Sequence, residues 1–162
     1  MPNQARQPES DGLTQKGLTD LCQRFERGTL AAGEISHRLH MAVIAYLLLT
    51  SDEAHAIQRI VAGLRALDRL GLPALLPGKR YNETITSFWI TMACRYLTLR
   101  VHHTDPARAT QAVVERFGDA PDLVYEYYSR NRLHSWDARA RWIEPDRRVL
   151  PGARDDEARC GP

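Results

Sequence analysis

The run from Ser36 to Thr50, SHRLHMAVIAYLLLT, constrains the fold more than any other part of the chain. From Met41 to Leu49 its only polar side-chain group is the hydroxyl of Tyr46. A helix that is apolar on every side has to be buried on every side. Its first turn carries two histidines, residues 37 and 40, whose spacing places them on one face. The run therefore predicts a central helix that begins with a pair of chemically capable side chains.

The rest of the chain also shows the apolar periodicity of helices and no alternation typical of strands. Helix starts are indicated by cap residues such as Ser36 and Asp105, and one helix end by Gly28. Five main helices are expected over about residues 18–27, 36–50, 52–70, 82–101 and 105–117, and two short ones over 122–129 and 135–143. This pattern predicts an all-α fold, a single-domain helical bundle over residues 17–147. The polar residues 1–16 and 148–162 are expected to be disordered tails.

Composition places the chain in the class of single-domain soluble proteins. Of its 162 residues 43% are hydrophobic, and the formal net charge is only +2, too small to favour nucleic acid or an anionic membrane as partner. Cys22, Cys94 and Cys160 are widely spaced, which excludes a CxxC zinc or redox motif. The apolar run is shorter than the roughly 20 residues of a membrane helix, and the N-terminus lacks a signal peptide. We therefore expect a cytoplasmic protein without a membrane partner.

His37 and His40 are the first candidates for chemistry. An HxxH pair in one helical turn can offer two imidazoles to a metal ion, and free N–H groups in the same turn favour an anion. Glu83 lies in the first turn of the helix expected over 82–101, and it would complete a zinc or non-haem iron ligand set if the two helices cross near their N-termini. The alternatives are a capping or hydrogen-bonded core role for the histidines, and a dipole-complementing role for Glu83.

Four stretches of the chain, taken in order, carry a resemblance to a known group of proteins. They are FERGTL at 25–30, ISHRLHMAVIAYLLL at 35–49, YNETITSFW at 81–89 and YYSRNRLHSWDARARWIEPD at 127–146. The chain resembles an uncharacterised family of small all-helical bacterial proteins in these motifs. The resemblance implies that two sets of residues form the family's motifs. The first set is His37, His40, Tyr81, Glu83 and Thr84, and the second is Tyr128, Ser129, Ser135, Ala138 and Arg139.

The chain departs from the family pattern at Asn82, where the usual residue is histidine. Asparagine can cap a helix and form hydrogen bonds, but it is a poor ligand for zinc or iron. The departure makes a divalent metal a less favoured cofactor and a small anionic molecule a more favoured partner. It also leaves open whether an activity has been lost.

Two functional hypotheses follow. In the first, the protein is a small-molecule-binding protein or a small enzyme of unknown reaction, with a polar site at the N-termini of the two central helices. Its catalytic or metal-binding residues would be His37, His40 and Glu83, and its substrate-binding residues would be Tyr81, Asn82, Thr84, Tyr128 and Arg139. In the second, the protein is a non-catalytic interaction or structural module in which these residues only tie helix ends together, with Arg139 pairing with Glu83 or capping carbonyls. A cavity lined by the histidines would favour the first hypothesis.

Overall fold

The computed structural model describes residues 13–75, 80–100 and 105–151, and within these ranges every regular element is helical. The five long helices are α1 (Gln15–Arg27), α2 (His37–Thr50), α3 (Glu53–Arg69), α4 (Glu83–Arg100) and α5 (Pro106–Phe117). They correspond one to one to the five main helices predicted from the sequence, so the all-α prediction is confirmed.

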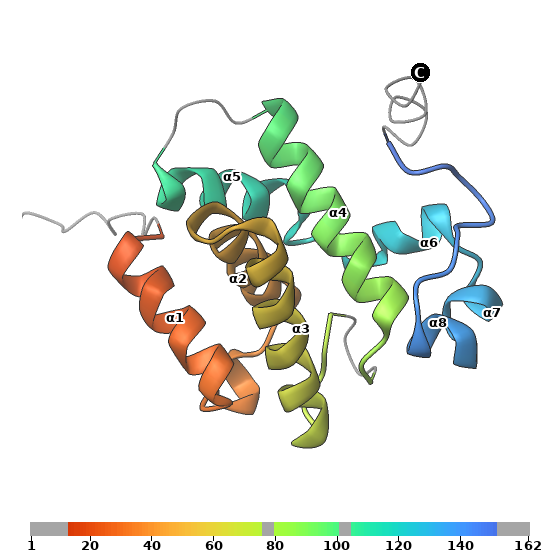
Figure 1. The fold of residues 1–162 in the computed structure, drawn as a ribbon, viewed down its shortest axis with the longest axis horizontal. Helices are drawn as coiled ribbons and strands as arrows, with labels where there is room; N and C mark the ends of the chain where they lie inside the picture. The colour runs from red at the N-terminus through yellow and green to blue at the C-terminus, as the bar shows by residue number, and fades with distance from the viewer. Residues whose placement is uncertain (1–12, 76–79, 101–104, 152–162) are drawn as a thin grey trace, which may run out of the picture.

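Helix α2 is the centre of the bundle. Its side chains are buried without a break from His40 to Leu47, and Met41 and Ala45 are fully inaccessible. It packs against α1, α3, α4 and α5. Figure 1 shows α1 at one side of the molecule, α3 in front of α2, and α4 crossing on the other side. The prediction that the apolar run would be enclosed on every side is therefore confirmed from His40 to Leu47, while Leu48 and Leu49 are only partly buried.

Local hydrogen bonds set the helix ends where the sequence predicts them. The Ser36 hydroxyl accepts from the backbone N–H of Leu39 at 3.1 Å, and the Asp105 carboxylate caps α5 in the same way. Gly28 ends α1 with a φ of 66°, the left-handed conformation that favours glycine. A glycine is also required at position 63, since a Cβ there would lie 2.1 Å from the Phe25 ring. This close approach packs α1 against α3.

The C-terminal part differs from the prediction of two short helices. After a 3₁₀ turn at Pro121–Leu123 come three helices, α6 (Val124–Tyr127), α7 (Arg130–Leu133) and α8 (Trp136–Ala140). Tyr128 has extended backbone angles and ends α6. The Ser129 hydroxyl then caps the first turn of α7. The prediction missed α7 because a four-residue helix leaves no periodic signal. These short helices pack beside α4, on the side away from α1 (Figure 1).

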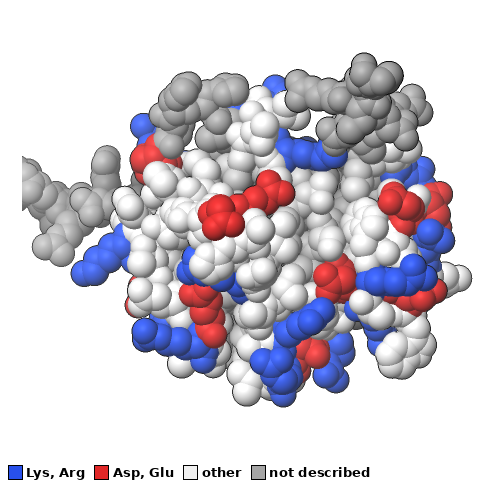
Figure 2. Space-filling view, viewed as in Figure 1, with Lys and Arg blue, Asp and Glu red and all other residues white. Residues whose placement is uncertain are grey.

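The tail predictions fall largely outside the described residues, which exclude 1–12 and 152–162. Helix α1 already begins at Gln15, with Thr14 as its N-cap. Among the described helices none is both long and apolar enough to cross a membrane. Figure 2 shows basic and acidic side chains interspersed over one face, without an extended patch of one sign.

Candidate functional site

His37 lies in the first turn of α2 and points into the protein. Its side chain is held by the Leu75 carbonyl, 3.0 Å from Nδ1, and by an edge contact with the Trp89 ring at 4.6 Å between centroids. Nε2 has no hydrogen bond, although the Phe117 carbonyl is near enough to favour the protonated form. Burial lowers the pKa of His37 and outweighs the opposing effects of the two carbonyls and Asp119.

His40 is buried more deeply, one turn further along α2. Only 1% of the residue is exposed, and neither ring nitrogen has a hydrogen-bond partner. The pKa of His40 is lowered to about 3, mainly by burial and to a smaller extent by the neighbouring His37. The ring is therefore a neutral imidazole at pH 7, with one N–H donor and one acceptor nitrogen. More than about 90% of buried polar groups in proteins have a partner, so His40 is an exception that requires an explanation.

The indole of Trp89 in α4 shares this property. Trp89 is fully buried, touches His37, and has no acceptor for its Nε1–H. In the part of the chain that the structure describes, the other buried side-chain atoms without a partner are Nε2 of His37 and the hydroxyl oxygen of Thr110 in α5. Since His37 contacts Trp89 and shares a helix face with His40, these three residues form one group, the histidine–tryptophan cluster.

Glu83 belongs to a different network. At the first residue of α4, its Oε2 accepts the Tyr81 hydroxyl at 2.6 Å and pairs with Arg65 of α3 at 3.0 Å. The Arg65 guanidinium also lies over the Tyr81 ring, 5.1 Å from the centroid. Burial and the Glu83 carboxylate raise the pKa of Tyr81 to about 12. Glu83 thus stabilises the contact between the ends of α3 and α4.

The histidines and Glu83 have separate partners. Trp89, which His37 touches, is about 9 Å further along the α4 axis than Glu83. No three histidine, cysteine, aspartate or glutamate side chains of the described residues are arranged to hold a metal ion. The predicted zinc or iron ligand set of His37, His40 and Glu83 is therefore not formed in this structure.

Three other predicted site residues bind the backbone of the C-terminal segment. The Thr84 hydroxyl donates to the Arg141 carbonyl at 2.8 Å and accepts from the Ile143 N–H at 3.2 Å. The Tyr128 hydroxyl donates to the Ile143 carbonyl at 2.9 Å. Asn82 donates from Nδ2 to the Leu133 carbonyl at 2.8 Å, and its Oδ1 caps α4 by accepting from the Ile85 N–H. The bonds of Thr84 and Asn82 attach the C-terminal segment to the start of α4, and the Tyr128 bond ties two parts of that segment together.

Arg139 does not join Glu83, contrary to one of the predicted arrangements. It is exposed on α8, and its side chain makes no ion pair or hydrogen bond with another described residue. The two motif sets still meet, through Thr84 and the backbone at 141 and 143. That meeting depends on the path of the C-terminal segment, which no residue spacing reveals.

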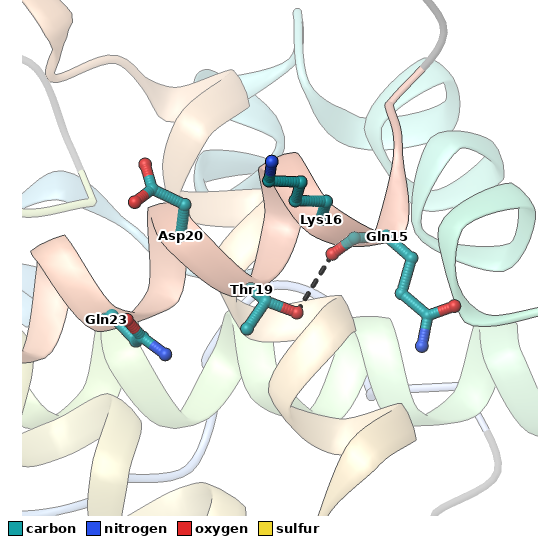
Figure 3. A pocket seen from close by; sticks show the side chains of 5 residues that line it. All are labelled: Gln15, Lys16, Thr19, Asp20 and Gln23. Atoms are coloured by element: carbon teal, nitrogen blue, oxygen red, sulfur yellow. Dashed lines mark hydrogen bonds between the residues drawn. The ribbon is translucent and has the colours of Figure 1, made fainter.

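Two surface hollows lie away from the predicted site. One, of about 590 Å³, runs along α1 and is lined only by polar side chains, among which Thr19 donates to the Gln15 carbonyl (Figure 3). The other, of about 700 Å³, lies in the C-terminal segment between Asn131 and Glu144. None of the predicted site residues lines either hollow. The histidine–tryptophan cluster is an interior site and not part of these hollows.

Trp89 is the site residue that the sequence analysis did not identify. In the sequence it belongs to the apolar stripe of its helix, which accounts for its burial. The signal that could have found it is chemical, because a buried indole N–H normally requires an acceptor.

Comparisons with protein-family models, with curated proteins and with solved structures find no match to this chain. The resemblance to the uncharacterised helical family stays a prediction.

Proposed function

We propose that the protein is a small-molecule-binding protein whose ligand is held in the interior, between α2 and α4, by the histidine–tryptophan cluster. The observation that carries the proposal is the unpartnered His40 ring, 99% buried with two free nitrogens. Leaving a buried polar group unpaired costs about 1–3 kcal/mol, a large fraction of the stability of a small domain. A residue that lowers stability in this way is typical of a binding site, because the groups that bind a ligand often destabilise the protein without it.

Binding is favoured over acid–base catalysis. An effective general acid or base has a pKa near the working pH. The His40 pKa of about 3 is too low for proton donation at neutral pH. A neutral imidazole is instead suited to donating one hydrogen bond and accepting another.

Native mass spectrometry of the purified full-length chain tests this proposal. The wild-type protein is expected to carry a non-covalent species that raises its mass above 18.4 kDa and is released on denaturation. His40→Leu keeps a buried side chain of similar size but removes both nitrogens, so the extra mass should disappear. His55→Leu, the same change at an exposed histidine of α3, should keep it. A wild-type protein without extra mass, or a His40→Leu protein that retains it, would refute the proposal.

A second candidate function is a helical interaction module. The bonds from Asn82, Thr84 and Tyr128 to the C-terminal backbone favour it, since they are wholly structural. Thr84→Val removes one donor and one acceptor, and we expect a loss of roughly 1–3 kcal/mol in the free energy of unfolding. If the protein binds a small molecule at the cluster, the extra mass should survive this change. Thr98→Val is the matched control, because Thr98 bonds only within its own helix at the surface.

A further inference from the structure

The interior of the described chain contains polar residues but no charged ones. Its buried polar or charged residues are His37, His40, Asn82, Thr84, Thr86 and Thr110, without any arginine, lysine, aspartate or glutamate. The ion pair next to the cluster, between Arg38 and Asp119 at 2.6 Å, is at the surface, with side chains 46% and 79% exposed. A charged ligand at the cluster would therefore lack a buried opposite charge, which is strongly unfavourable.

The hydrogen-bonding groups of the cluster further restrict the ligand. Both nitrogens of His37 face backbone carbonyls, Nδ1 that of Leu75 and Nε2 that of Phe117, so the groups left for a ligand are those of Trp89 and His40. Trp89 Nε1 only donates, while a neutral His40 donates from one nitrogen and accepts at the other. A complementary ligand thus offers two acceptor positions and one donor. A carbonyl oxygen has two lone pairs, and an amide nitrogen beside it supplies the donor, so a primary or secondary amide matches all three groups.

We infer that the ligand of the histidine–tryptophan cluster is a small uncharged molecule bearing an amide or a similar donor–acceptor group. The inference rests on the proposed function and excludes the anionic ligand expected from the sequence. Because the three side chains are buried, the bound group is enclosed by α2 and α4 and shielded from water.

Acetamide and acetate form a matched pair of probes for this inference, since they have nearly the same shape and differ in charge. Binding of each probe to the ¹⁵N-labelled full-length protein, refolded after the co-purified species has been removed by denaturation, can be followed by NMR at pH 7. The reporters are the His40 ring nitrogens and the Trp89 indole N–H. Acetamide should shift both signals in a saturable manner, and acetate should bind at least about tenfold more weakly. The indole of Trp136, which is 86% exposed, should not shift with either probe.

Variants complete the test. His40→Leu should abolish the acetamide-dependent shift of Trp89, while His55→Leu should leave it unchanged. Acetate binding as tightly as acetamide would overturn the inference of an uncharged ligand and leave the proposed function intact. Failure of both probes, or equal shifts of Trp89 and Trp136, would also overturn the inference. Failure of the proposed function is seen separately, as the absence of any co-purifying mass in the wild-type protein.

Discussion

Glu83 accepts two hydrogen bonds at one oxygen, from the Tyr81 hydroxyl and from the Arg65 guanidinium. We expect Glu83→Gln to lower the free energy of unfolding by roughly 1 kcal/mol, because a charge-assisted bond weakens and a partly exposed ion pair is lost. Urea denaturation measures this change. The mass bound to the wild-type protein should be unaffected, since Glu83 is not part of the histidine–tryptophan cluster.

Glu53→Gln is the matched control for this substitution. Glu53 also begins a helix and complements its dipole, but its side chain forms no bond with another described residue. A loss as large as that of Glu83→Gln would show that the helix dipole, and not the network with Arg65 and Tyr81, is the source of the effect. Loss of the bound species in Glu83→Gln would instead show that Glu83 takes part in ligand binding.

At the scale of elements, the approach of α1 to α3 depends on Gly63. A Cβ at this position would overlap the Phe25 ring, which is itself buried in the core. Gly63→Ala should therefore cost about 1–3 kcal/mol in the free energy of unfolding, as is usual for overpacking, despite the better helix propensity of alanine. The thermal unfolding midpoint followed by circular dichroism is the measurement.

Gly33→Ala provides the comparison, since a Cβ at residue 33 meets nothing within 4 Å. It should leave the unfolding midpoint unchanged or raise it slightly by restricting the unfolded chain. A Gly63→Ala protein as stable as the wild type would mean that α1 shifts away from α3 without cost, and that their packing is not tight.

For the whole molecule, the buried histidines predict sensitivity to acid. The folded-state pKa of His40 is lowered from 6.5 to about 3, and that of His37 is lowered too. Between those values the unfolded state binds more protons than the folded state, so stability falls as the pH decreases from about 6.5 toward 3. Both shifts act in the same direction, so the free energy of unfolding should fall continuously through this pH range.

The measurement is the urea midpoint between pH 7.5 and pH 4.5. The wild-type midpoint should drop steeply, the His40→Leu midpoint should drop much less, and His55→Leu should behave like the wild type because His55 is exposed. Equal slopes for wild type and His40→Leu would contradict a neutral, buried His40.

The sequence by itself determined the five long helices and the centre of the fold, although it did not reveal the short helix α7. Helix periodicity, cap residues such as Ser36 and Asn82, and the uninterrupted apolar run of α2 act within a few residues of the chain. Such local features can be recognised without knowing which helices touch. The same information predicted that His37 and His40 share a face of the central helix.

Only the tertiary structure decided the partners of those residues. Whether Glu83 meets the histidines or Arg65 depends on how α2, α3 and α4 cross, and that crossing is set by close packing of many side chains at once. The bonds of Thr84 to residues 141 and 143 depend on the path of a distant segment. The unpartnered nitrogens of His40 and Trp89 are also tertiary features, because a polar atom lacks a partner only when every helix packed against it offers none.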